Sequence, residues 1–176
     1  EIMIRDEGYR LFFTGSKYYF EKEFDKAIKL YKKAVNLGNS YAMNNLAFCY
    51  KKGQGVKKDI NQAISLYEKA VNLNNSYAMC NLAVCYKNGE GVEKNINYAI
   101  SLYEKAVNLG NSQAMTKLAI CYENGEGVEK DINYAISLYE KAVNLGNLTA
   151  VHNLVYRYEK GEGVEKNILK VIELYE

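Results

Sequence analysis

The sequence contains no proline, no tryptophan and one histidine among its 176 residues. No apolar run approaches the ~20 residues that span a bilayer, and no signal-peptide pattern opens the chain, so we predict no membrane association. The net charge is +2, with 23 basic and 21 acidic side chains. Nucleic-acid-binding proteins usually carry a larger basic surplus, so this balance predicts no nucleic-acid partner.

The four cysteines have a spacing that favours neither a disulfide nor a metal site. Cys49, Cys85 and Cys121 recur every 36 residues, and equivalent positions of stacked helical repeats lie about 10 Å apart, too far for a disulfide. Cys80 and Cys85 lie on one predicted helix and are poorly placed to bridge. No Cys-x-x-Cys or Cys/His pair suits zinc. We therefore expect free, buried thiols, no metal and a cytoplasmic protein.

Neither the histidine nor the glycine-rich segments indicate catalysis. The sequence places no serine, cysteine or carboxylate beside His152, the single histidine, as a nucleophilic mechanism would require. The segment "NGEGVEK" lacks the GxxxxGK[ST] pattern and follows a predicted helix rather than a strand, so it indicates a structural turn. We predict no catalytic residue and no cofactor.

The sequence repeats itself every 36 residues. Glycine followed by valine, and single alanine, leucine and tyrosine positions, all recur with this period. These positions are Gly55-Val56, Gly91-Val92, Gly127-Val128 and Gly163-Val164; Ala42, Ala78, Ala114 and Ala150; Leu46, Leu82, Leu118 and Leu154; and Tyr50, Tyr86, Tyr122 and Tyr158.

Each repeat contains two apolar stripes with helical spacing. Ala42, Leu46 and Tyr50 lie at i, i+4 and i+8, which predicts a first helix. The second stripe has the i, i+3, i+4, i+7 pattern of an amphipathic helix; it consists of Ile60, Ala63, Ile64, Tyr67, Ala70 and Val71. No segment shows the alternation of a half-buried strand, so the repeat is a pair of helices.

Residues suited to helix ends flank both stripes. We predict that Gly53 ends the first helix in a left-handed conformation and that Val56 packs between helices. Oxygen-bearing side chains begin the second helices, where they cap exposed N–H groups; these are Asp59, Asn95, Asp131 and Asn167. Gly38, Asn74, Gly110 and Gly146 end the second helices, and Asn39, Asn75, Asn111 and Asn147, or Ser40 and its equivalents, cap the next ones.

The combined pattern is Ala-x3-Leu-Ala-x2-Tyr, then Gly-x-Gly-Val-x2-(Asp/Asn), then Ala-Ile-x-Leu-Tyr-x-Lys-Ala. It resembles the Sel-1-like repeat, a relative of the tetratricopeptide repeat. The resemblance covers 39–74, 75–110, 111–146 and an incomplete copy at 147–176. Residues 1–38 are predicted to form an N-terminal cap, in which 15–34 resemble a plain tetratricopeptide unit without the Gly-Val corner. The resemblance implies an all-α fold, an α-solenoid in which antiparallel helix pairs form a right-handed superhelix with a concave face.

The resemblance also implies a non-catalytic adaptor that binds a protein or peptide partner in its concave groove. In tetratricopeptide-like folds the first helix of each pair lines this groove. The corresponding positions here are Tyr41, Asn44, Phe48 and Lys51; Tyr77, Cys80, Val84 and Lys87; Gln113, Thr116, Ile120 and Glu123; and Thr149, His152, Tyr156 and Glu159.

These positions vary between repeats, whereas residues 99–109 and 135–145 are identical. Random drift on an exposed helix face explains such variation, and so does adaptation of a groove to a ligand. A change from Lys51 and Lys87 to Glu123 and Glu159 would orient an extended peptide, with aromatic residues as anchors. Cys80 faces either groove or solvent and is the predicted most reactive thiol.

Three other functions compete with this one. The last repeat lacks the end of its second helix, so an exposed face would allow stacking on a second copy, or a solenoid end would dock a catalytic domain. Intrinsic enzymatic activity has no support in the sequence. Recognition of RNA by helical repeats is disfavoured by Glu123 and Glu159 in the predicted groove.

Overall fold

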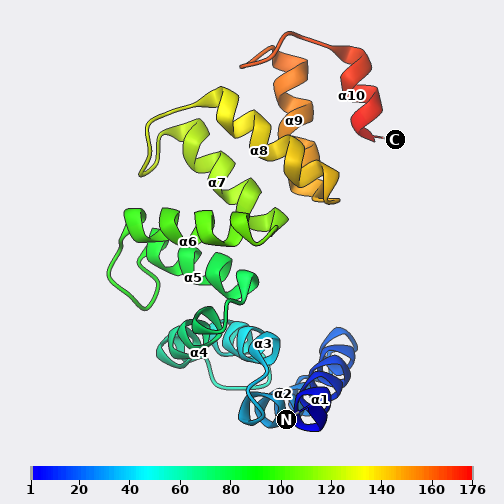
Figure 1. Cartoon of the computed structure of the whole chain (residues 1–176), viewed down its shortest axis with the longest axis vertical. Helices are drawn as coiled ribbons and strands as arrows, with labels where there is room; N and C mark the ends of the chain where they lie inside the picture. The colour runs from blue at the N-terminus through cyan, green and yellow to red at the C-terminus, as the bar shows by residue number, and fades with distance from the viewer. Residues whose placement is uncertain (1, 176) are drawn as a thin grey trace. The chain divides into compact units, whose positions relative to one another are not determined.

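The computed structural model describes residues 2–175, which form helices joined by turns and contain no strand (Figure 1). The ten helices of this part of the chain have the following bounds. They are α1 (Ile2–Phe20), α2 (Phe24–Asn36), α3 (Ser40–Lys52), α4 (Ile60–Asn72), α5 (Ser76–Asn88), α6 (Ile96–Asn108), α7 (Ser112–Asn124), α8 (Ile132–Asn144), α9 (Leu148–Lys160) and α10 (Ile168–Tyr175). The predicted all-α fold is confirmed.

The helices form two compact units, the first up to Lys94 and the second from Asn95. In the first unit α1 packs against α2 and α3 against α4, while α2 contacts α3 and α4 contacts α5. In the second unit α7 packs against α8 and α9 against α10, while α6 contacts α7 and α8 contacts α9. Stacked pairs of neighbouring helices therefore build an α-solenoid, as the resemblance to the Sel-1-like repeat implied.

The helix ends are those that the sequence predicted. The Asn39 side chain accepts a hydrogen bond from the Ala42 N–H at 2.8 Å, and Asn75, Asn111 and Asn147 cap α5, α7 and α9 in the same way. Asparagine, rather than the following serine or leucine, is thus the capping residue. Asp59, Asn95, Asp131 and Asn167 each accept from the N–H three residues later.

The corner between the two helices of a repeat brings a glycine against the preceding repeat. Gly127 has a φ of 73°, and a β-carbon placed on it would lie 2.5 Å from Cγ1 of Ile96 on α6. Gly55 approaches Phe24 of α2 in the same manner. Val128 is only half-buried. The close contact between repeats is therefore made by the glycine, and the valine that the sequence suggested fills the gap only in part.

The first helix pair replaces this corner with additional helix. α1 continues to Phe20, and a short turn at 21–23 leads into α2. Gly15, at the repeat position of Lys51, is buried against the ring of Tyr31. The predicted absence of the Gly-Val corner is confirmed, and the capping role of residues 1–38 stays a prediction.

The interior of both units consists of alanine, leucine and tyrosine side chains at repeated positions. Alanines on every helix from α2 to α9 are buried, which lets neighbouring backbones approach closely. One tyrosine on each of the second helices α2, α4, α6 and α8 is also fully buried; these are Tyr31 and Tyr67 in the first unit and Tyr103 and Tyr139 in the second.

The buried tyrosine hydroxyls differ in their hydrogen bonds. The Tyr139 hydroxyl donates to Glu123 at 2.8 Å, and the Tyr31 hydroxyl donates to Ser16 Oγ at 3.2 Å. The Tyr67 hydroxyl has no hydrogen-bond partner within the described chain, and burial raises its pKa. A buried hydroxyl without a partner loses its bonds to water and gains none in return.

Replacing Tyr67 by phenylalanine should therefore leave the free energy of unfolding unchanged or raise it by up to about 1 kcal/mol. Tyr139→Phe is the matched control, because it removes a hydrogen bond to a carboxylate and should lower this free energy by about 1–3 kcal/mol. Urea denaturation followed by circular dichroism measures both values. Equal destabilisation by the two substitutions would contradict the prediction.

Candidate functional site

The residues predicted to line a groove differ in their exposure. Seven are exposed, seven are partly exposed and two are buried. The exposed ones are Tyr41, Tyr77, Gln113, Thr149, His152, Tyr156 and Glu159; the partly exposed ones are Asn44, Phe48, Lys51, Val84, Lys87, Ile120 and Glu123; and the buried ones are Cys80 and Thr116.

The structure corrects the prediction for Cys80. All four cysteines are free and buried, so the expectation of an accessible, reactive Cys80 thiol is wrong. Cys80 and Thr116 have short side chains that stay below the surface at a position from which the longer His152 reaches solvent. The expectation of free, buried thiols is confirmed, and burial raises the pKa of the Cys49 thiol to about 11.

A row of aromatic rings crosses the first helices of the first unit. The rings of Phe12 on α1 and Tyr41 on α3 have centroids 5.6 Å apart, and the rings of Tyr41 and Tyr77 on α5 have centroids 6.2 Å apart. The ring centroids of Tyr9 and Tyr41 are 6.1 Å apart. Tyr41 and Tyr77 are 38% and 48% exposed. We call Tyr9, Phe12, Tyr41 and Tyr77 the aromatic row.

Lys51 reaches from the end of α3 to the following repeat. Its Nζ atom lies 2.7 Å from Oε2 of Glu90 and 3.6 Å from Sγ of Cys85. Hydrogen bonds from Lys51 and from Asn88 lower the pKa of Glu90. Burial disfavours the charged form of Lys51, but its bonds to Glu90 and Cys85 outweigh burial and raise its pKa.

Glu123 occupies the position of Lys51 in the second unit and has the opposite charge. It pairs with Arg157 of α9, which stands where the other repeats have cysteine, and Arg157 pairs in turn with Glu162. The guanidinium also lies 5.6 Å from the ring centroid of Tyr156. The reversal of charge from Lys51 to Glu123 is therefore compensated by a change at the position that the side chain contacts.

Lys51 and Glu123 were predicted as groove charges, and the structure shows both of them engaged in contacts between repeats. Sequence reasoning noted the change from lysine to glutamate, but it did not connect that change with the replacement of cysteine by Arg157. Their matching positions in successive repeats were the available signal. A basic-to-acidic direction along a single groove stays a prediction.

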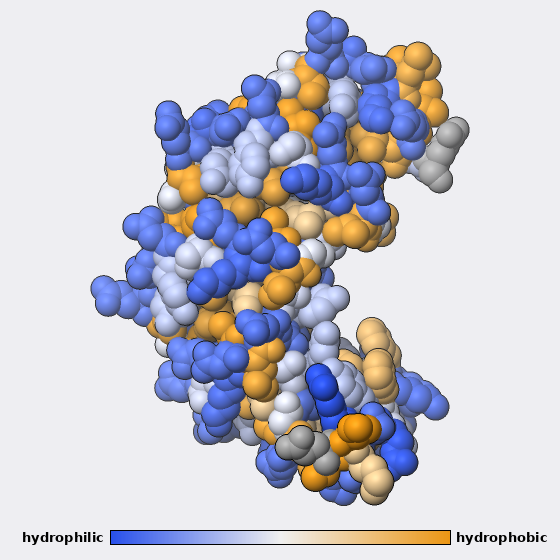
Figure 2. Space-filling view, in the orientation of Figure 1, coloured by the Kyte–Doolittle hydropathy of each residue, from blue (hydrophilic) through white to orange (hydrophobic). Residues whose placement is uncertain are grey.

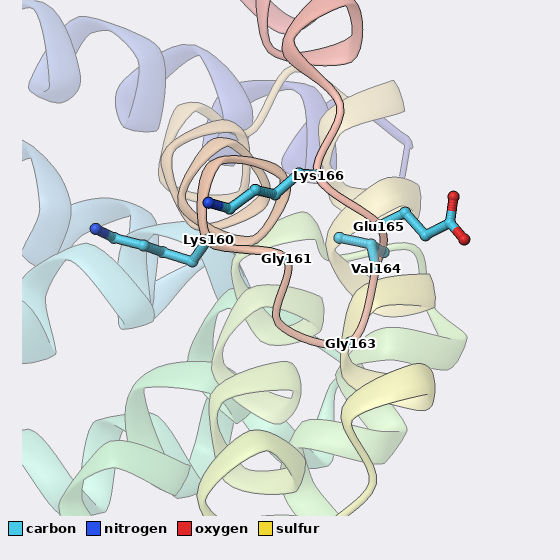
Figure 3. A pocket seen from close by; sticks show the side chains of 6 residues that line it. All are labelled: Lys160, Gly161, Gly163, Val164, Glu165 and Lys166. Atoms are coloured by element: carbon cyan, nitrogen blue, oxygen red, sulfur yellow. The ribbon is translucent and has the colours of Figure 1, made fainter.

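The corner between α9 and α10 contains a shallow hollow of about 630 Å³. Figure 3 shows Lys160 and Lys166 extending to one side of this corner and Glu165 to the other. Within residues 2–175, no three or more His, Cys, Asp or Glu side chains gather as metal ligands. No helix in the same range has the length and apolar character needed to cross a membrane.

The family model of the Sel1 repeat matches residues 8–39, 40–75, 76–111, 112–147 and 149–176. For the four corner-containing copies, these matches begin one or two residues after the starts predicted from the period. The chain therefore belongs to the Sel1 repeat family. Sel1 repeats typically form non-catalytic scaffolds, and proteins built from them generally mediate protein–protein interactions. No curated protein is significantly similar to the chain.

Solved structures support the same assignment. A Sel1 repeat protein from Oxalobacter formigenes superposes with a TM-score of 0.85 and is 31% identical, over 96% of this chain and 70% of that one. A protective antigen with an SLR fold from uropathogenic Escherichia coli superposes with a TM-score of 0.79 and is 28% identical, over 96% of this chain and 37% of that one. An immunity protein from Pseudomonas aeruginosa superposes with a TM-score of 0.64 and is 27% identical. This match covers 83% of this chain and 59% of that one.

The junction between α7 and α9 generates a testable charge exchange. Arg157→Cys leaves Glu123 near Glu162 without the intervening cation, and it should lower the free energy of unfolding by about 2–4 kcal/mol. Adding Glu123→Lys recreates the arrangement of Lys51, Cys85 and Glu90 and should recover part of this loss. Urea denaturation measures each variant.

The control for this exchange is Glu159→Lys in the Arg157→Cys background. Glu159 is exposed, so the same change of charge at this position should restore much less stability than Glu123→Lys. Equal recovery by both second substitutions would show that net charge, rather than the junction, determines the effect.

Proposed function

We propose that this chain is a non-catalytic binding module that holds a protein or peptide partner on its first helices. The observation that carries this proposal is the aromatic row of the first unit. Its rings are contributed by α1, α3 and α5, and Tyr41 and Tyr77 are substantially exposed. Exposed tyrosines in a row are a common composition of interface centres, because each ring offers a large contact area and a hydroxyl.

The neighbouring residues support an apolar contact surface with a polar border. Phe48 and Val84 are partly exposed on α3 and α5. The amide of Asn81 donates to Asn44 Oδ1 at 2.9 Å, which fixes these two polar side chains across α3 and α5. Lys51 is already engaged in contacts with Glu90 and Cys85. We therefore assign the main binding energy to the aromatic row rather than to the charge of Lys51.

The groove positions of the second unit are part of the same proposal. Gln113, Thr149, His152 and Tyr156 are exposed, and Tyr156 supplies an aromatic contact beside Arg157. These side chains are more polar than those of the aromatic row. We propose that they add selectivity for the partner, since polar contacts of exposed residues contribute more to specificity than to affinity.

Truncation of the aromatic row tests the proposal. Tyr41→Ala/Tyr77→Ala should weaken capture of partners by about tenfold or more, since aromatic residues at interface centres often contribute above about 1 kcal/mol each. Tyr98→Ala/Tyr134→Ala is the matched control, because both residues are tyrosines on second helices with 39% exposure. Quantitative mass spectrometry of pull-downs compares the variants. Equal capture by the wild type and Tyr41→Ala/Tyr77→Ala would contradict the proposal.

A second candidate function is self-association through α10. Ile172 and Tyr175 are 51% and 62% exposed, whereas Ile136 and Tyr139 at the same repeat positions of α8 are 7% and 1% exposed. Within the second unit, α9 packs against α8. Figure 2 shows apolar surface over α10. We propose that a second copy covers this face with its own α10 in a two-fold contact.

Light scattering over a range of concentrations tests the second candidate. The wild type should form dimers as the concentration rises, and Ile172→Asp should shift the midpoint of dimerisation upward by about tenfold or more. Leu169→Asp is the control, because Leu169 lies on α10 at the position of an exposed asparagine in α8. A wild-type chain that stays monomeric at all concentrations would contradict this candidate.

A further inference from the structure

The corner between α3 and α4 differs from the other corners in its charge. Residues 51–59 contain four lysines and one aspartate. The corresponding corner at 87–95 has as many lysines as glutamates, and those at 123–131 and 159–167 have more acidic than basic residues. The backbone pattern of all four corners is the same, so the fold itself does not require this cluster of lysines.

Two acidic groups at this corner, Asp59 and Glu90, are already engaged. Asp59 accepts the N–H of Gln62 at 3.0 Å as the cap of α4, and Glu90 pairs with Lys51 at 2.7 Å. Lys52, Lys57 and Lys58 are exposed. These three lysines form no ion pair within residues 2–175, and together they give the corner a local positive charge.

The fold directs two of these lysines to one hollow. Lys51, Lys52, Lys58, Ile60 and Glu90 line a depression of about 400 Å³ beside the corner.

The backbone around this hollow is well fixed. Gly53 ends α3 in a left-handed conformation with a φ of 72°, and the Asp59 N–H donates to the Tyr50 carbonyl at 2.9 Å. The ammonium of Lys52 lies 5.8 Å from the ring centroid of Phe48, so the hollow adjoins the first-helix face that contains the aromatic row.

We propose that this basic corner binds an acidic segment of a protein partner, with partner carboxylates contacting Lys52 and Lys58. The inference rests on the proposed protein-binding function and names the chemistry of the partner. Two lysine ammonium groups beside a neutralised Lys51–Glu90 pair provide charge complementarity to Asp or Glu side chains. Ile60 adds an apolar wall against which the methylene groups of a glutamate pack.

A protein segment fits this corner better than a nucleic acid does. The chain as a whole has a net charge of only +2, so the corner lacks the wide basic surface that a polynucleotide requires.

Fluorescence anisotropy with a short labelled peptide of alternating Glu and Ser tests the inference at low salt. We expect this peptide to bind more tightly than the same peptide with Gln in place of Glu, and added salt should weaken the binding. Lys52→Glu/Lys58→Glu should reduce the affinity about tenfold or more. Lys94→Glu/Lys130→Glu is the control, since it changes the net charge equally at corner lysines outside 51–59 and should reduce affinity about twofold or less.

Three results would overturn the inference: equal affinity for the Glu and Gln peptides, equal loss in both lysine variants, or displacement of the peptide by an equal concentration of single-stranded RNA. The tyrosine variants separate this inference from the proposed function. If Tyr41→Ala/Tyr77→Ala retains all partners while Lys52→Glu/Lys58→Glu loses the peptide, the basic corner binds and the aromatic row does not. If Tyr41→Ala/Tyr77→Ala loses partners while Lys52→Glu/Lys58→Glu keeps the peptide, only the proposed role of the basic corner is refuted. Circular dichroism verifies that every variant is folded.

Discussion

The two units depend on contact between helices that carry very small residues where they meet. Buried alanines on every helix from α2 to α9 allow backbone-to-backbone approach, and the second glycine of each corner meets a side chain of the preceding repeat where a β-carbon would not fit. A single helix pair buries only one of its apolar faces. The stability of each repeat is therefore inseparable from the neighbour that covers its other face, and substitutions that enlarge these small residues act on two repeats at once.

Polar contacts join successive repeats in addition to the apolar packing. The chain uses the same geometric position for Lys51 and for Glu123, and each side chain extends to the following repeat. Lys51 meets a thiol and a carboxylate, while Glu123 meets the guanidinium of Arg157 and the hydroxyl of Tyr139. Since partly buried charges without partners are strongly destabilising, these contacts determine which repeats are compatible neighbours.

Much of the fold was predictable from the sequence because it depends on local rules that recur with one period. The cap residues, the left-handed glycines and the two apolar stripes are each properties of a few adjacent residues, and the structure confirms them. The contacts that sequence reasoning missed join residues about a full repeat apart, such as Lys51 and Cys85, or Glu123 and Arg157. The burial of Cys80 was also missed, because the helical position alone does not show how far neighbouring side chains cover it.

The candidate site was less predictable for the same reason. The sequence identified Tyr41 and Tyr77 as exposed aromatic residues, but their packing with Tyr9 and Phe12 required the placement of α1 against α3. The matched junction of Glu123 and Arg157 also has a consequence for the history of such a gene. Excision of residues 111–146 would leave complete helix pairs on both sides of the join, yet it would bring Lys87 into the place of Glu123, opposite the Arg157 cation. Electrostatic repulsion would oppose this rearrangement, and the copies, although nearly identical in places, are not interchangeable at this junction.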